Sequence, residues 1–249
     1  NRAQLNYFGS DLSTGEKKEA LDQMTKLLDT FVDSKEYGSI LKVEQYDWEL
    51  LRRFANNVDT NEQLSFDTYG LDETADQIRE LIAIGEIMER KYWVVSTNPP
   101  YATISNLCNN INKFVKENYP DSKIDLFAVF IEHCKQMMVT NGYQAMITMH
   151  SWMFLTSFEK LRNKFSKVYL VNMVHLGARA FEEIGGEKVQ TTSFVIQNTQ
   201  IDNCNGIYCD MTSGNSQTAK EKLYLSKQFR YIAKQSDFGK IPGTPMAYW

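Results

Sequence analysis

The fold of this chain is decided by the stretch KYWVVSTNPPY, which runs from Lys91 to Tyr101. Tyr, Trp and two Val residues of high β propensity lead into Ser-Thr and then into two consecutive prolines. Proline lacks an N–H donor and has a fixed φ, and it pushes the residue before it toward extended geometry. The stretch therefore predicts a buried strand that ends in a stiff turn, Asn98-Pro99-Pro100-Tyr101.

The sequence on both sides of this strand predicts an α/β fold with a helical segment at its start. Residues 1–90 carry helical hydrophobic periodicity, and Ser13 with Glu16 has the spacing of a capping box. Beyond the turn, a helix pattern over 121–142 is followed by further apolar strands and a second helix. This alternation is typical of a doubly wound sheet, and the strands around 168–177 and 191–198 are expected to pair like a hairpin.

Composition and charge narrow the class of protein. The 249 residues carry a net charge of −4, which argues against nucleic-acid binding by bulk electrostatics but leaves room for a local basic face. The four cysteines form no CxxC pair, so we expect reduced thiols and no metal site. The sequence has no apolar run of ~20 residues and no signal-peptide pattern, which indicates a cytoplasmic protein without a membrane partner. Because the chain begins with Asn rather than Met, we expect an internal piece of a longer protein.

The turn offers two hydrogen-bond acceptors and an aromatic ring within four residues. The side-chain oxygen of Asn98 and the carbonyl of Pro99 can accept both hydrogens of one amino group, while Tyr101 can stack on a planar base. Two acceptors on one amine favour a tetrahedral nitrogen whose lone pair points toward an alkyl donor. This geometry suits amino methylation without a strong general base. The alternative is that Asn98 caps the turn and Tyr101 packs on its rim.

Several blocks of the chain resemble one family of enzymes. Besides KYWVVSTNPPY, the blocks are GSILKVEQYDWELL, DLFAVFIEHCKQMM, GYQAMITMHSWMFLTSFEKLRNKF, VNMVHLGARAFEEIGGEKVQTTSFVIQN and IPGTPMAYW. They are similar to blocks of DNA adenine-N6 methyltransferases that use S-adenosylmethionine. Within these, they resemble the large PglX group of bacteriophage-exclusion (BREX) systems and related single-chain restriction-modification enzymes. The resemblance covers roughly residues 16 to 249 and implies a partial Rossmann-like methyltransferase fold.

In that family, the turn holds the amino group of an adenine that is flipped out of double-stranded DNA. The resemblance implies that Asn98 and Pro99 hold the amino group and that Tyr101 stacks on the base. It makes Asn98, Pro99, Pro100 and Tyr101 together the catalytic residues. The cofactor would be S-adenosylmethionine. The full-length protein would bind double-stranded DNA and act alongside other phage-defence proteins.

Four further residues receive roles from the same resemblance, and a fifth is singled out by its position near the expected base pocket. A second aromatic residue of the family faces the target base, and Phe181 and Phe194 are the two candidates. Phe181 is favoured because it lies in a glycine-containing loop, whereas Phe194 also suits the core of a strand. Asp125 and Phe127 of the DLF block would border the cofactor's adenine, although Phe127 equally suits a helix core. Arg179 is a candidate contact to a DNA phosphate.

Other polar residues have plainer interpretations. The three histidines, His133, His150 and His175, are expected in core or rim roles rather than in catalysis. The basic residues between positions 160 and 167 are expected on a solvated face, with a DNA phosphate contact as the alternative.

The sequence departs from the family where the cofactor should bind. The family needs closely spaced glycines after its first strand, whereas Gly9, Gly15 and Gly38 lie far apart here. We therefore expect the main cofactor loop to lie outside this chain, and we expect the chain alone to be inactive.

The expected domain organisation and two alternative functions follow. We expect a mostly helical lead-in over 1–90, the catalytic half of the methyltransferase sheet over 91–200, and a polar extension over 201–249 that leads toward an absent recognition domain. Relatives that share Asn-Pro-Pro-Tyr act on a protein glutamine or on RNA, so amino methylation of those substrates stays open. A non-catalytic interaction module is the other alternative.

Overall fold

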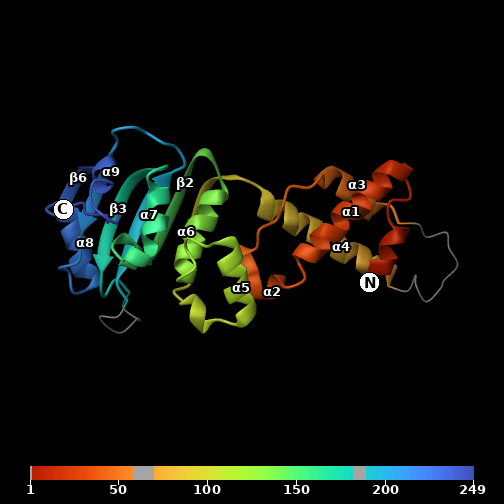
Figure 1. Cartoon of the computed structure of the whole chain (residues 1–249), viewed down its shortest axis with the longest axis horizontal. Coiled ribbons are helices and arrows are strands. Elements are labelled where there is room, and N and C mark those ends of the chain that lie inside the picture. Colours follow the sequence, from red (N-terminus) through yellow and green to blue (C-terminus); the bar gives the residue numbers. More distant parts are fainter. Residues whose placement is uncertain (1, 59–69, 182–188) are drawn as a thin grey trace. The chain divides into compact units, whose positions relative to one another are not determined.

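The computed structural model describes residues 2–58, 70–181 and 189–249, and the chain forms two compact units, Asn1–Arg90 and Lys91–Trp249 (Figure 1). The first unit is helical, and the second contains a six-stranded sheet. The chain thus combines a helical first segment with α/β structure, as the sequence pattern predicts.

Helices dominate the first unit. They are η1 Arg2–Tyr7, α1 Thr14–Thr30, α2 Ser34–Tyr37, η2 Gly38–Ile40, α3 Trp48–Asn56 and α4 Leu71–Glu89, where η marks a 3-10 helix. Their apolar faces form one core, in which Met24 of α1, Phe54 of α3 and Ile82 of α4 are at most 1% exposed. Gly85 of α4 permits a close approach, because a Cβ there would lie 3.0 Å from the Trp48 ring.

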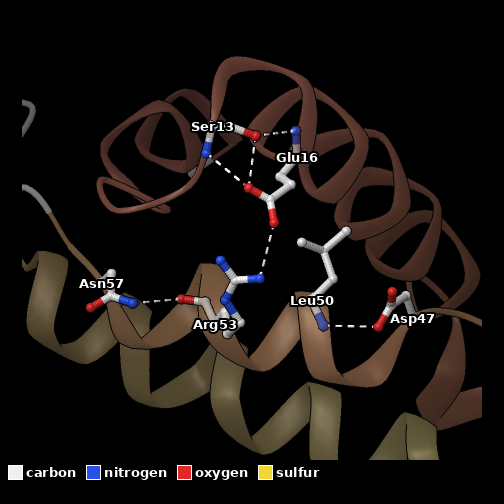
Figure 2. Close-up of polar contacts among 6 residues, drawn as sticks. All are labelled: Ser13, Glu16, Asp47, Leu50, Arg53 and Asn57. Carbon is white, nitrogen blue, oxygen red and sulfur yellow. Dashed lines mark hydrogen bonds and ion pairs between the residues drawn. The ribbon is translucent and has the colours of Figure 1, made fainter.

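Side-chain caps fix where α1 and α3 begin (Figure 2). Ser13 and Glu16 form the predicted capping box, in which the Ser13 N–H donates to the Glu16 carboxylate at 3.0 Å. Arg53 of α3 donates to the same carboxylate at 3.0 Å, and Asp47 accepts the Leu50 N–H at 2.9 Å. The hydrogen bonds from Ser13, followed by that from Arg53, lower the pKa of Glu16 to about 2.

The sheet of the second unit is mixed. Its strands are β1 Tyr92–Thr97, β2 Met138–Met149, β3 Tyr169–Gly177, β4 Thr191–Gln197, β5 Asn205–Asp210 and β6 Arg230–Lys234, in the order β1-β2-β4-β3-β5-β6. β4 runs antiparallel to both β2 and β3, and β6 runs antiparallel to β5. β1, β2, β3 and β5 therefore run in one direction and end at one common edge of the sheet.

Two expectations about strands need correction. β1 was expected to be buried, but it forms an edge of the sheet, and its Trp93 and Val94 side chains are 68% and 64% exposed. The segment 201–249 was expected to be a polar extension, but it supplies β5 and β6 to the sheet. Residues 201–249 are polar in composition because β5 and β6 are short. Only alternate side chains of these strands, such as Tyr208, enter the core.

The second unit also contains helices, and several of them share one apolar core with the strands of the sheet. The helices are η3 Ile104–Asn106, α5 Asn109–Asn118, α6 Leu126–Gln136, η4 His150–Met153, η5 Thr156–Phe158, α7 Glu159–Phe165, α8 Gln217–Ser226 and α9 Gln235–Phe238. In the core, Trp152 stacks on Phe165 of α7 with ring centroids 4.7 Å apart. The helix predicted over 121–142 is shorter, because β2 begins at Met138 and Asn141 adopts a positive φ of 65°.

Candidate functional site

The turn Asn98-Pro99-Pro100-Tyr101 directly follows β1, at the edge where the four parallel strands end. In open α/β sheets, ligands bind at this edge. The side chains that gather there are therefore the first candidates for a functional site.

Tyr101 and Asn98 hold each other within the turn. The Tyr101 hydroxyl lies 3.2 Å from the Asn98 side-chain oxygen and 3.4 Å from the backbone carbonyl of Ile147 in β2. Burial raises the pKa of Tyr101 to about 12, so the hydroxyl keeps its hydrogen and acts as a donor at neutral pH. Asn98 thereby has a fixed amide orientation, and its oxygen retains a second lone pair for another donor.

Phe127 supports the Tyr101 ring from the core. The two rings meet edge to face, with centroids 6.4 Å apart and planes at 89°. Phe127 is 1% exposed and also packs against Phe158. This burial favours the core role that the sequence left open for Phe127, because an enclosed ring has no surface left for a cofactor.

Asp125 fastens the chain that leaves the turn. It is the N-cap of α6, and its carboxylate accepts the N–H of Phe127 at 3.4 Å, the N–H of Ala102 at 3.2 Å and the hydroxyl of Thr103 at 3.3 Å. Burial raises the pKa of this carboxyl group, and the hydrogen bonds oppose the shift. Asp125 thus positions the turn, and its contact with a cofactor stays a prediction.

The structure separates the two candidates for base stacking. Phe194 lies on β4 with 0% exposure, and its ring packs edge-on against Trp152 and Phe165. It cannot stack on a ligand without unpacking the core, so the expectation for Phe194 is wrong. Phe181 is half-buried in the loop after β3, and residues 182–188 of that loop lie outside the described residues.

Helix α8 holds the loop that carries Arg179 and Phe181. The buried Lys220 ammonium donates to the carbonyls of Leu176, Met211 and Gly214 at 2.6, 3.0 and 2.6 Å. One turn earlier on the same helix, Gln217 donates to the carbonyl of Ala180 at 3.3 Å.

Arg179 itself is exposed, with a φ of 57°, and its contact with a DNA phosphate stays a prediction. The sequence gives no signal for the role of Lys220, because a lysine on a short polar helix is ordinarily solvated.

The basic residues between 160 and 167 do not all face solvent. Lys164 is paired with Asp121 at 2.8 Å and with Glu132 at 2.6 Å. Arg162 is 2% exposed, and its guanidinium donates to backbone carbonyls of Trp152, Leu155, Gly243 and Thr244. Lys164 and Arg162 are thus engaged by protein partners and are not available to contact a phosphate. Lys160 and Lys167 are exposed, as expected.

The residues that the structure describes show neither a metal-binding cluster nor an open site for the adenosine part of a cofactor. Within them, no group of three or more His, Cys, Asp or Glu side chains is placed to hold a metal ion. The Asp125 carboxylate is engaged by the backbone and Phe127 is enclosed, so the two expected cofactor residues do not form an open site. Across the same residues, no helix is both long and apolar enough to cross a membrane.

Comparison with known proteins gives a consistent picture. The model of the family described as Eco57I restriction-modification methylase matches residues 6–181. Over 234 residues, the chain is 39% identical to the adenine-specific methyltransferase PglX of Lacticaseibacillus casei strain Zhang. Over 228 residues, it is 34% identical to the adenine-specific methyltransferase BrxX of Escherichia coli O9:H4 strain HS.

Each alignment covers 91% of this chain but 19% of the relative, so the chain spans about a fifth of the length of these relatives. A solved type I restriction-modification methyltransferase subunit from Streptococcus thermophilus is 14% identical, with a TM-score of 0.42. That alignment covers 90% of this chain and 57% of the solved one.

Proposed function

Because this chain belongs to the Eco57I restriction-modification methylase family, we propose that the whole protein is a site-specific DNA adenine-N6 methyltransferase. It transfers a methyl group from S-adenosylmethionine to an adenine flipped out of the duplex, in phage defence or restriction-modification. The observation that carries the proposal is the Asn98-Pro99-Pro100-Tyr101 turn at the carboxyl end of β1, with Tyr101 hydrogen-bonded to Asn98.

The turn acts on the nitrogen nucleophile. The exocyclic amine of adenine is a poor nucleophile because its lone pair is delocalised into the ring. The Asn98 side-chain oxygen accepts one amino hydrogen with its free lone pair, and the Pro99 carbonyl accepts the other. With both hydrogens held, the nitrogen becomes tetrahedral and its lone pair points at the methyl donor.

The residues around the turn make this arrangement stiff. Proline at two successive positions fixes the backbone, Asp125 fixes the chain that follows, and Phe127 supports the Tyr101 ring. The half-buried Tyr101 ring stacks on the flipped base. Preorganised acceptors of this kind need no rearrangement during the reaction, which is the main source of their catalytic effect.

S-adenosylmethionine supplies an electrophilic methyl group when bound. We propose that its main binding loop belongs to another part of the whole protein, since the described residues offer no cradle for it. The chain alone is then expected to show no measurable binding of S-adenosylmethionine by calorimetry. Micromolar binding to this chain would contradict that expectation.

Double-stranded DNA is the proposed partner, and the cytoplasm, where that DNA lies, is the proposed location. Arg179 is exposed in the same loop as Phe181, which suits contact with a backbone phosphate. Other phage-defence proteins are further proposed partners, as the resemblance of the sequence to the bacteriophage-exclusion group implies.

The substrate class is tested with the full-length protein and labelled S-adenosylmethionine. Unmethylated duplex DNA, RNA and a release-factor-like protein are offered separately, and the expected product is N6-methyladenine in the DNA alone. Methyl transfer to protein or RNA, with none to DNA, would overturn the proposal in favour of the corresponding alternative. An absence of transfer to all three would favour the interaction module.

A further inference from the structure

A chain of hydrogen bonds joins two histidines and a tyrosine near the carboxyl edge of the sheet. His150 directly follows β2, and its Nδ1 lies 2.8 Å from Nε2 of His175 in β3. Nδ1 of His175 lies 2.9 Å from the hydroxyl of Tyr248. The ring of Phe154 packs at 5.9 Å from each imidazole. The three polar groups therefore tie together two strand ends and a distant third segment.

The hydrogen-bond partners determine which nitrogens carry hydrogen. Tyr248 is 3% exposed, and within the described residues its hydroxyl has Nδ1 of His175 as partner. A buried hydroxyl hydrogen without an acceptor is costly, so Tyr248 donates to that nitrogen. Neutral His175 then carries its hydrogen on Nε2 and donates it to Nδ1 of His150. Neutral His150 is left with its own hydrogen on Nε2, on the far side of its ring.

Both imidazoles are uncharged near neutral pH. Burial, reinforced by the neighbouring His150, lowers the pKa of His175 to about 4, and burial also lowers the pKa of His150. Asp210 opposes the shift at His175, and Lys220 adds to it. Burial raises the pKa of Tyr248, which keeps its hydroxyl protonated. His150 is thus a neutral N–H donor rather than a cation.

His150 also lies close to the turn. β1 and β2 are parallel neighbours, and the Tyr101 hydroxyl reaches the carbonyl of Ile147 in β2. The three residues from Ile147 to His150 span at most ~11 Å of extended chain. His150 is partly exposed, and its Nε2 has no protein partner in the part of the chain that the structure describes.

We propose that His150 donates a hydrogen bond from Nε2 to a ring nitrogen of the target adenine, with His175 and Tyr248 as positioning residues. This inference rests on the proposed function. Once Asn98 and Pro99 hold the amino hydrogens, the groups left on the edges of adenine are its ring-nitrogen acceptors. A neutral donor matches an uncharged ring nitrogen, whereas a phosphate favours a cation.

The test uses the full-length protein and asks whether the effect of changing His150 depends on the presence of one particular ring nitrogen in the target adenine. Duplexes carry adenine, 1-deazaadenine, 3-deazaadenine or 7-deazaadenine at the methylated position, so that each analogue removes one ring nitrogen. For one of the three analogues, replacing adenine should lower the kcat/KM of wild type about tenfold more than it lowers the kcat/KM of His150→Phe. A difference of this size corresponds to one hydrogen bond. His150→Phe should methylate adenine about tenfold more slowly than wild type.

Matched variants separate the proposed bond from a structural role. His150→Gln places an amide N–H near the position of Nε2 and should restore discrimination against that analogue, whereas His150→Asn reaches only the position of Nδ1 and should not. All variants are compared at equal folded concentration, measured by circular dichroism. Equal discrimination by wild type and His150→Phe against all three analogues would overturn the inference while leaving the proposed function intact. A wild-type enzyme that methylates no DNA would overturn both.

Discussion

In the helical unit of residues 1–90, polar side chains such as Ser13, Glu16 and Arg53 act near the surface, at the ends of helices. In the sheet unit of residues 91–249, polar side chains such as Lys220 and His175 are buried and join segments far apart in the sequence. Burying a polar group costs free energy unless it is fully hydrogen-bonded. The contrast teaches that some buried polar groups of the sheet unit, such as Lys220 and His175, hold distant segments together near the carboxyl edge of the sheet.

The largest expected effect on stability comes from Lys220. Lys220→Met leaves three buried carbonyls without their charged donor, so the free energy of unfolding should fall by about 4 kcal/mol. Denaturant unfolding of this chain measures the loss, and hydrogen exchange should show new opening of residues 176–180. Lys222→Met, on the exposed side of the same helix, is the control and should change stability little. Equal losses of unfolding free energy in the two variants would contradict the role of Lys220 in holding these carbonyls.

A pH effect of nearly the same size is expected from His175. An unfolded histidine binds a proton below pH 6.5, whereas His175 in the fold binds one only below about 4. Between these values the unfolded state binds more protons, so stability is full above pH 6.5 and falls by about 3 kcal/mol as the pH drops to 4. The difference in unfolding free energy between wild type and His175→Gln, measured across this range, isolates the term. A difference that does not vary with pH would contradict the buried neutral imidazole.

A smaller effect is expected at the turn. Asp125→Ala removes the acceptor for Ala102, Thr103 and Phe127 and should cost about 2 kcal/mol. Asp125→Asn keeps a side-chain oxygen in place and carries no charge into a site where burial already raises the pKa of the carboxyl group, so it should cost clearly less. Hydrogen exchange at the Ala102 N–H reports the local change. The same loss in both variants would mean that the charge, not the acceptor geometry, matters.

The smallest effect is expected in the helical unit. Ser13→Ala removes one cap of α1 and should cost about 1 kcal/mol, while Ser13→Asn retains a capping oxygen and should cost little. Thermal unfolding of the two variants makes the comparison. If Ser13→Ala proved as costly as Lys220→Met, the distinction between local caps and buried braces would fail.

Local patterns of the sequence predict local structure well. The Ser13–Glu16 capping box and the strand that runs into Asn98-Pro99-Pro100-Tyr101 both form, because each depends on residues adjacent in the chain. The paired strands β3 and β4 also form, because their apolar runs are unambiguous.

Features that depend on distant residues were not predictable in the same way. Phe194 has the same chemistry whether it faces a ligand or the core, and only the packing of Trp152 and Phe165 around it decides. The sequence shows Lys220 only as a charged residue on a polar helix, yet the fold buries it beneath two loops. The end of α6 at Gln136 depends on the pairing of β2 with its neighbours, which no local period encodes.

The central claim is that the turn after β1 presents an adenine amine for methylation. The most direct measurement compares the rate at which full-length wild type and full-length Asn98→Ala form N6-methyladenine in duplex DNA, by mass spectrometry of digested nucleosides at equal folded concentration. Removal of one preorganised hydrogen-bonding group from a catalytic site typically costs about 10²- to 10³-fold in rate, and a loss of this size is predicted here. Near-full activity of Asn98→Ala would contradict the account.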